Sequence, residues 1–160
     1  MFTASSKLTL APIIQTTMTS KKTVLITGCS DGGIGSGIAL AFHQRGYHVF
    51  ATARDTSKMF ALKDLPRMTL LILDVEDPTH IVNAVKTVES KTGGILDILI
   101  NNAGRNHFMP VLDINIDKAK RIFDTNFWGS LAVTQAFTPL VIKAEGTIVN
   151  IGSISGNVNG

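Results

Sequence analysis

Short apolar segments alternate with segments of helical periodicity from residue 22 onward, and this alternation constrains the fold more than any other feature. Five runs have the length and composition of strands: Thr23–Thr27, Tyr47–Ala53, Met68–Leu73, Ile95–Ile100 and Gly146–Ile151. Strands separated by helices predict βαβ units and a parallel sheet. The nearly continuous apolar character of these runs fits strands that are buried on both faces. The sequence therefore predicts an α/β fold, a Rossmann-type doubly wound parallel sheet of about five strands.

Three segments between the predicted strands have the apolar spacing of helices. The first ends before Gly46, a residue typical of a helix C-terminus. The second begins at Asp77-Pro78, an N-cap followed by proline at the first helical position. The third is long and begins near Asp117. The predicted apolar faces are Ile34, Ile38, Ala41 and Phe42, then Ile81, Val82, Val85 and Val88, then Phe123, Phe127, Leu131, Phe137 and Val141.

Composition limits the class of protein. A chain of 160 residues with 44% hydrophobic and 17% charged residues suits one globular domain. No apolar run approaches the length that crosses a bilayer. The net charge of +3 forms no basic stripe, so nucleic acid is not an expected partner. A single cysteine, Cys29, excludes an internal disulfide and a cysteine-based zinc site, and no metal is expected.

The first twenty residues differ from the rest, being rich in Ser and Thr with one Lys and no acid. We interpret residues 1–20 as a disordered extension and residues 21–160 as the dinucleotide-binding domain, which is incomplete. Mitochondrial targeting by residues 1–20 is the alternative, although the segment lacks the Arg of typical presequences. Met18 is an alternative start.

A glycine-rich run, TGCSDGGIGSG at Thr27–Gly37, connects the first predicted strand to the first helix. Glycines permit a tight turn and close approach of the backbone to a ligand, and the helix N-terminus offers free N–H groups to a pyrophosphate. An ordinary turn is the alternative, but the position between strand and helix favours dinucleotide binding. We expect Asp31 to point away from the phosphates. The predicted cofactor contacts are Gly28, Ser30, Gly33, Ile34 and Gly35.

The end of the second strand bears on the choice of cofactor. Sites selective for NAD carry an acid there, which binds the ribose 2′-hydroxyl. This chain has Arg54 followed by Asp55. A guanidinium forms a forked, charge-assisted contact with a 2′-phosphate. We therefore predict NADP(H), bound by Arg54, with Asp55 as the competing candidate for NAD.

The same loop also fits the Gly-x-Ser-x-Gly pattern of serine hydrolases, as Gly28-Cys29-Ser30-Asp31-Gly32. A lipase-like hydrolase would need a histidine partner for Ser30. The candidates are His43, His48, His80 and His107. Because hydrolases place this motif after a later strand, we keep the hydrolase as a minor alternative only.

Five motifs, in order, resemble those of the short-chain dehydrogenase/reductase family. Thr27–Gly35 is similar to the family's glycine-rich signature, with one residue more than the common spacing. Asp74 follows the third strand, Asn101–Gly104 reads NNAG after the fourth, Asn126 lies in the long helix, and Ser153 follows the fifth strand. The resemblance extends from about residue 23 to residue 160.

The resemblance assigns roles to these positions. It implies cofactor contacts from Asp74, Val75, Asn101, Ala103 and Gly104, in addition to the glycine loop. It also implies that Ser153 orients a substrate carbonyl and that Asn126 supports a water relay. These expectations come from the family and not from the spacing of the residues.

Within the family, the stretches GCSDGGIG, ATARD and Pro110–Gly129 resemble fungal NADPH-dependent reductases of 1-acyldihydroxyacetone phosphate. This implies an oxidoreductase that reduces a small-molecule, lipid-linked carbonyl in glycerolipid synthesis. It also implies a cytoplasmic protein or one at the surface of the lipid droplet or endoplasmic reticulum.

The family's proton donor, the Tyr of a Tyr-x-x-x-Lys motif, has no counterpart here. The single tyrosine is Tyr47, and the fourth residue after it is Ala51. The motif would fall beyond Gly160, so we expect a C-terminally truncated chain with little carbonyl reduction, since general acid–base catalysis contributes about 10²–10⁴-fold. A catalytically inactive NADP-binding fragment is the alternative. Truncation also argues against the family's homo-oligomer and predicts exposure of Phe123, Phe127 and Phe137.

Overall fold

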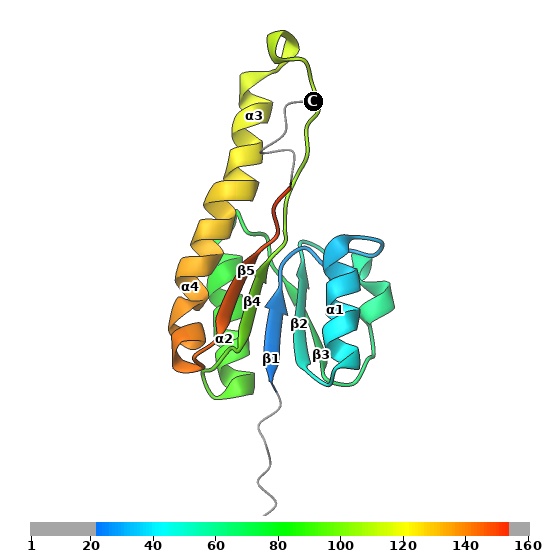
Figure 1. Ribbon diagram of the computed structural model, residues 1–160, viewed down its shortest axis with the longest axis vertical. Helices are drawn as coiled ribbons and strands as arrows, with labels where there is room; N and C mark the ends of the chain where they lie inside the picture. Colours follow the sequence, from blue (N-terminus) through cyan, green and yellow to red (C-terminus); the bar gives the residue numbers. More distant parts are fainter. Residues whose placement is uncertain (1–21, 154–160) are drawn as a thin grey trace, which may run out of the picture.

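Five parallel strands form one sheet in the order β3-β2-β1-β4-β5 (Figure 1). The computed structural model describes residues 22–153, so the predicted extension at residues 1–20 lies outside the described residues. The strands are β1 (Thr23–Ile26), β2 (His48–Ala53), β3 (Met68–Ile72), β4 (Ile98–Asn101) and β5 (Thr147–Asn150). The predicted α/β fold is confirmed, and the strand ends differ from the prediction by a few residues.

The helices follow the predicted order. The α-helices are α1 (Ile34–Gln44), α2 (Pro78–Thr92), α3 (Ile116–Phe123) and α4 (Ser130–Lys143). The remaining turns are the 3₁₀ segments η1 (Thr56–Lys58), η2 (Phe60–Leu62) and η3 (Val111–Asp113), and the π-helical segment η4 (Asp124–Gly129). The predicted long helix is present as α3, η4 and α4, which form one continuous rod (Figure 1). In residues 22–153 no helix has the length and apolar character needed to span a bilayer.

The predicted start of α2 is confirmed. The Asp77 carboxylate accepts hydrogen bonds from the N–H groups of Thr79 at 2.8 Å and His80 at 3.3 Å, and Pro78 occupies the first turn. These bonds stabilise the charged form and lower the pKa of Asp77. The cap fixes where the chain leaves β3 and enters α2, and thereby the position of the segment between them.

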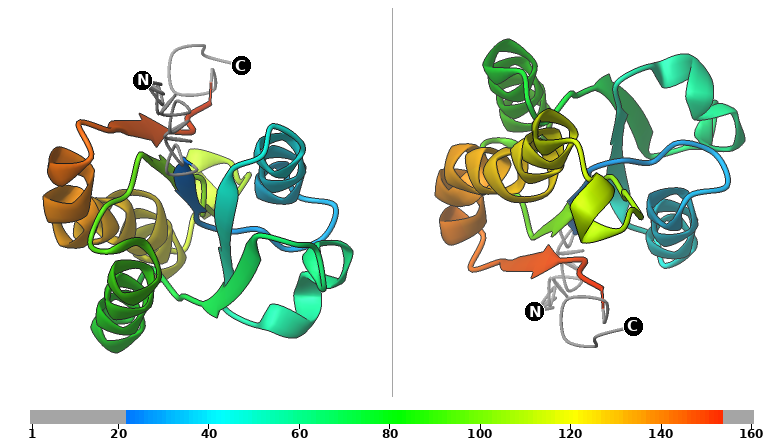
Figure 2. Two further views of the ribbon diagram at one scale, coloured as in Figure 1. Left: turned by 90° about the horizontal axis from the view of Figure 1, so that it is seen from below. Right: turned by 90° about the horizontal axis from the view of Figure 1, so that it is seen from above.

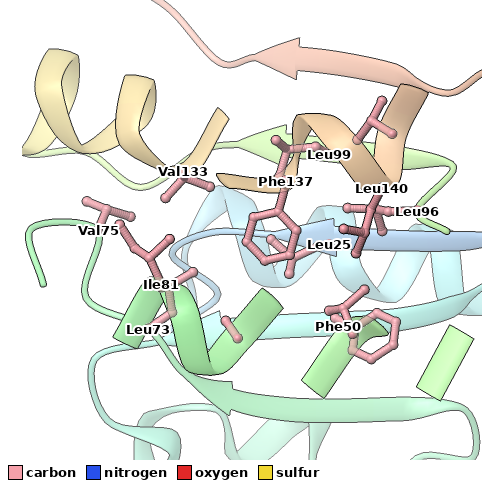
Figure 3. Close-up of a cluster of buried hydrophobic side chains, with 13 residues drawn as sticks. Leu25, Phe50, Leu73, Val75, Ile81, Leu96, Leu99, Val133, Phe137 and Leu140 are labelled. Carbon is pink, nitrogen blue, oxygen red and sulfur yellow. The ribbon is translucent and has the colours of Figure 1, made fainter. Parts of the chain in front are cut away.

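Alternation along the strands divides the core between the two faces of the sheet. Leu25 and Phe50 face α2 and α4 and pack against Phe137 (Figure 3). Val24 and its neighbours on the opposite face pack against Ala39 of α1. Figure 2 shows α1 on one side of the sheet and α2 and α4 on the other. Both faces of the central strands are therefore covered, as a parallel sheet requires.

Some predicted faces are wrong in detail. Phe137 is fully buried, whereas Phe123 and Phe127 are 64% and 53% exposed, as expected for those two. Val82 of α2 is half-exposed, and Ala84 takes the buried position instead. β3 is an edge strand that pairs only with β2, so its residues are half-buried and Ile72 is exposed.

Candidate functional site

A cleft of about 1010 Å³ opens along the edge of the sheet where the parallel strands end. Residues at or after the end of every strand line it: Gly28 and Ser30 (β1), Ala53 and Arg54 (β2), Leu73–Glu76 (β3), Asn101–Asn106 (β4) and Asn150–Ser153 (β5). The chain leaves β1 for β2 on one side and returns to β4 on the other. Open α/β sheets bind their ligands outside the strand ends at such a switch point.

The helical rod supplies the other wall of the cleft. Residues 125–127 of η4 and Ser130, Leu131 and Thr134 of α4 line it. η4 approaches the segment after β3 so closely that a Cβ at Gly129 would lie 2.6 Å from a Val75 methyl carbon. Glycine at this position therefore allows the rod to close over the strand ends.

Close contacts within the protein determine the shape of the glycine loop. Gly28 has φ +75°, and a Cβ there would lie 2.9 Å from the Ala103 Cα. A Cβ at Gly35 would collide with the Gly28 carbonyl oxygen, so α1 can pack against the loop only with glycine. Gly33 at the N-cap of α1 has no side chain with which to satisfy the first N–H groups of the helix.

Of the predicted loop contacts, Gly28, Ser30 and Ile34 line the cleft, whereas Gly33 and Gly35 do not. Gly35 is buried behind the loop, and Gly33 ends it. The structure therefore gives these two glycines supporting positions in the backbone.

A hydrogen-bond cluster holds the glycine loop against the segment after β4. The Thr27 hydroxyl accepts from the N–H groups of Asn102 and Ala103, both at 2.9 Å. The Asn102 side-chain amide donates to the carbonyl oxygens of Thr27 at 2.8 Å and Gly28 at 3.0 Å. Asn102 was not among the predicted site residues, although it belongs to the NNAG run. These hydrogen bonds, all between protein groups, fix the floor of the cleft.

Two loop residues face away from the cleft. The Asp31 carboxylate accepts from the N–H groups of Phe60 at 2.8 Å and Ala61 at 3.1 Å, which satisfies the start of η2. Cys29 is fully buried, and burial raises the pKa of its thiol to about 12. A thiol in this state is a packing group and a poor nucleophile.

The described residues do not have the geometry that the serine hydrolase alternative requires. No histidine lines the cleft in the described part of the chain. His43 and His48 are held elsewhere, by the Pro66 carbonyl and the Thr69 hydroxyl, each at 2.9 Å. Ser30 therefore has no histidine partner among the described residues of its own cleft.

Arg54 and Asp55, the two candidates for cofactor discrimination, lie in different surroundings. Arg54 is exposed and lines the cleft. Asp55 does not line it, and its carboxylate accepts from the N–H of Ser57 at 2.9 Å at the start of η1. Hydrogen bonds from Ser57 lower the pKa of Asp55. The acid next to Arg54 is therefore used to cap a turn.

The predicted polar residues after β3 and β4 all line the cleft. Asp74 accepts from the N–H of Glu76 at 3.1 Å, which forms a tight turn at the cleft wall. The Asn101 side chain donates to the Thr134 hydroxyl at 2.9 Å and to the Asn150 side-chain oxygen at 2.8 Å. Asn101 thus ties β4 to β5 and to the rod, and its own side-chain oxygen is buried without a partner in the described residues.

Asn126 lies within the π-helical segment and reaches across to the segment after β4. Its side-chain oxygen accepts from the Arg105 N–H at 2.8 Å, and its Nδ2 donates to the Arg105 carbonyl at 2.9 Å. Ser153 lines the same cleft from the end of β5. The two residues to which the family resemblance assigned catalytic roles therefore both line this cleft. π-helical turns of this kind are frequent at functional sites.

Glu76, Arg105 and Thr125 are among the lining residues that the sequence analysis missed. The Arg105 guanidinium lies 3.4 Å from the Glu76 carboxylate, and the Thr125 hydroxyl donates to the same carboxylate oxygen. Glu76 and Arg105 both follow the end of a strand, and this position is the indication of a site residue that the sequence contains. Their pairing depends on the approach of two distant segments, and no local pattern encodes it.

Tyr47 lies away from the cleft. It precedes β2 at the opposite end of the sheet and packs edge-on against Phe42, with ring centroids 4.9 Å apart. Within residues 22–153 the cleft wall contains no Tyr, Lys or His. The carboxylates of Asp74 and Glu76 line the cleft, but the described wall contains no Tyr-Lys pair of the kind that the family resemblance implies as proton donor.

The sequence profile described as short chain dehydrogenase matches residues 22–160. The chain belongs to the short-chain dehydrogenase family. Short-chain dehydrogenase PC-15 of Penicillium crustosum is 56% identical over 135 residues, covering 84% of this chain and 50% of the relative. An NADPH-dependent 1-acyldihydroxyacetone phosphate reductase of Schizosaccharomyces pombe is 43% identical over 137 residues, covering 86% of this chain and 46% of the relative. The chain spans about half the length of the curated short-chain dehydrogenases it matches.

Solved structures of the family share the fold. A short-chain dehydrogenase from Streptomyces avermitilis matches with a TM-score of 0.79 and 30% identity, over 89% of this chain and 53% of that chain. An NADPH-bound carbonyl reductase from chicken fatty liver matches with a TM-score of 0.78 and 29% identity, over 85% of this chain and 61% of that chain. Short-chain dehydrogenases are oxidoreductases that bind a nicotinamide cofactor, which agrees with a cleft at the switch point of the sheet.

Proposed function

We propose that residues 22–153 form the cofactor half of an NADPH-dependent oxidoreductase that reduces a carbonyl group. The observation that carries the choice of NADPH is the separation of Arg54 and Asp55: the cation lines the cleft and the acid is turned away into a cap. A guanidinium in this position matches a 2′-phosphate, whereas NAD selectivity would need an acid in the cleft.

The residues of the loop fit a dinucleotide. A Cβ at Gly28 would collide with the Ala103 backbone and one at Gly35 with the Gly28 carbonyl oxygen, so glycine lets the loop pack closely, and α1 begins with N–H groups that Gly33 leaves uncapped. Such a helix start favours a pyrophosphate. We assign Gly28, Ser30 and Ile34 to the pyrophosphate side, Arg54 and Asp74 to the adenosine side, and Val75, Asn101, Ala103 and Gly104 to the cofactor-facing wall.

The bound cofactor supplies a hydride to a carbonyl carbon. In our proposal Ser153 donates a hydrogen bond to the carbonyl oxygen, and Asn126 holds the segment at Arg105 that borders the same space. The reduction also consumes a proton, and the described cleft wall contains no Tyr or Lys to deliver it. The relative from Schizosaccharomyces pombe suggests 1-acyldihydroxyacetone phosphate as the substrate.

A second function is favoured by that same wall. Without a Tyr-Lys pair in that wall, the described residues would act as an NADP-binding module that does not turn over. The two functions differ in one measurement, the oxidation of NADPH by the 160-residue chain in the presence of a ketone. Oxidation above the rate of a Ser153→Ala variant would exclude the non-catalytic module.

The cofactor proposal is tested by calorimetric titration of the chain with NADPH and with NADH. We expect NADPH to bind more tightly. Arg54→Gln should weaken NADPH by about tenfold or more and leave NADH unchanged, since one charge-assisted contact corresponds to at least that factor. Arg45→Gln is the matched control, because Arg45 lies at the far end of α1 and donates to the Ala41 carbonyl. Equal binding of the two cofactors, or equal loss in both arginine variants, would refute the proposal.

A further inference from the structure

A second, smaller pocket of about 210 Å³ lies beside the cleft, between the segment after β4 and helix α3. Figure 1 shows that segment running alongside α3 before the chain turns back into the helix. The pocket is lined by Arg105, Asn106, His107, Lys118, Arg121 and Ile122. Arg105 and Asn106 also line the cleft, so the two hollows share a wall.

The pocket is basic. Three cationic side chains and one histidine line it, and no acid does so among the described residues. Lys118 and Arg121 stand on the same face of α3, and neither forms an ion pair within residues 22–153. Arg105 alone is engaged, by Glu76 at 3.4 Å on the cleft side. Like charges gathered in one hollow repel each other, and a bound anion would relieve this repulsion.

A buried polar atom also lacks a partner here. His107 Nε2 is buried and forms no hydrogen bond with the described residues. Unsatisfied buried side-chain nitrogens are uncommon, and an imidazole Nε2–H can donate to an anion. His107, a residue of the pocket wall, therefore carries a ring nitrogen without a hydrogen-bond partner among the described residues.

The strand order separates the pocket from the proposed site of the cofactor's 2′-phosphate. β2, which leads to Arg54, and β4, which leads to Arg105, lie on opposite sides of β1. The Arg105 backbone is bonded to Asn126, so the pocket adjoins the part of the cleft that Asn126 lines. An anion in this pocket would belong to a molecule that occupies that part.

We propose that this pocket binds the anionic group of the carbonyl substrate, and that the group is a phosphate monoester. The assignment to a substrate rests on the proposed reductase function. The pocket is much smaller than the cleft and can hold a phosphate group, and the surrounding groups offer the several charged donors that a dianion requires. The pocket would thus place a substrate by its charge, with its carbonyl toward Ser153.

The test is an NMR titration of the isotope-labelled chain with three probes: dihydroxyacetone phosphate, inorganic phosphate and uncharged dihydroxyacetone. We expect dihydroxyacetone phosphate to shift amides of residues 105–107 and 118–122 saturably and to bind more tightly than inorganic phosphate. Lys118→Gln/Arg121→Gln should weaken it by about tenfold or more. Lys120→Gln should not, because Lys120 lies outside the pocket and 3.9 Å from Asp117. The same spectra report whether each variant is folded.

Several outcomes would overturn the proposal. Dihydroxyacetone binding as tightly as its phosphate would remove the anion site, and inorganic phosphate binding at least as tightly as the monoester would remove the substrate assignment. Equal losses of affinity in Lys118→Gln/Arg121→Gln and in Lys120→Gln would indicate that binding depends only on the overall positive charge of the chain. A chain that ignores dihydroxyacetone phosphate but binds phosphatidylcholine vesicles only when they contain phosphatidic acid would assign these cations to a membrane surface instead. A parallel NADPH titration, sensitive to Arg54→Gln alone, separates failure of the cofactor proposal from failure of this one.

Discussion

Both polar groups of the Asn126 side chain are bound by the backbone of one residue, Arg105, with distances of 2.8 and 2.9 Å. The two residues belong to different layers, one in the π-helical segment and the other after β4. The reciprocal pair fixes the segment that forms the shared wall of the cleft and the basic pocket. Asn126 is therefore a positioning residue for that wall.

Asn126→Ala should release the Arg105 backbone. The variant loses two neutral hydrogen bonds at a partly exposed site, which predicts about 1 kcal/mol of lost stability and faster amide exchange at Arg105. Hydrogen-exchange NMR at that amide measures the effect directly. Gln135→Ala, at an exposed position of α4, is the control and should leave the exchange rate unchanged. Unchanged exchange at Arg105 in Asn126→Ala would contradict the positioning role.

Gly35 and Gly37 offer a matched pair within α1. A Cβ at Gly35 collides with the Gly28 carbonyl and the Asn102 amide, whereas a Cβ at Gly37 meets nothing within 4 Å. Gly35→Ala should destabilise the chain by about 1–3 kcal/mol through overpacking. Gly37→Ala should stabilise it by about 0.5–1 kcal/mol, because alanine favours a helix interior. Urea unfolding measures both, and equal effects in the two variants would be inconsistent with the packing described.

Phe137 and Phe123 lie on one helical rod in opposite environments, fully buried and 64% exposed. Phe137→Ala should cost about 3–5 kcal/mol because it empties the contact with Leu25 and Phe50. Phe123→Ala should change the free energy of unfolding by no more than about 0.5 kcal/mol. Thermal and urea denaturation of the two variants test the contrast, which a similar loss in both would contradict.

His48 makes stability depend on pH. Burial, followed by the charges of Lys91 and Arg67, lowers the pKa of His48 below its usual 6.5. The unfolded chain therefore binds this proton more readily, so the contribution of His48 is complete above about pH 6.5 and declines as pH falls through the folded pKa. His48→Phe keeps the aromatic contact with Phe50 and removes the titration. Melting temperatures between pH 7 and pH 5 should fall less in the variant; parallel falls would argue against this assignment.

The order and type of the elements were predictable because their signals are local: apolar runs, the Asp77-Pro78 cap and the glycine loop. The burial of Phe137 was not. A π-helical turn winds more residues per turn, so η4 changes the phase between Phe123 and Phe137, and a constant helical period wrongly places them on one face. Val82 is an apolar residue on an exposed face of α2, and the local sequence does not distinguish it from the buried residues of that helix.

The candidate site was predictable where residues follow strand ends, as at Ser30 and Arg54. Asp74, Asn126 and Ser153 came only from the family resemblance. The pair between Arg105 and Glu76, and the basic pocket below it, depend on irregular backbone and on approach between distant segments. Periodicity carries no information about either.

The bonds from Thr27 to Asn102 and Ala103 also impose an order of assembly. They join residues 75 and 76 positions apart, and they can form only when β4 docks on β1. A growing or refolding chain that has paired only its first three strands contains the glycine loop but not its support. Such distant contacts form late, because the entropic cost of closing the loop must be met before the contacts can stabilise the chain. Nucleotide binding in a refolding experiment would therefore report the docking of β4, and a bound nucleotide would stabilise only chains that have completed that step.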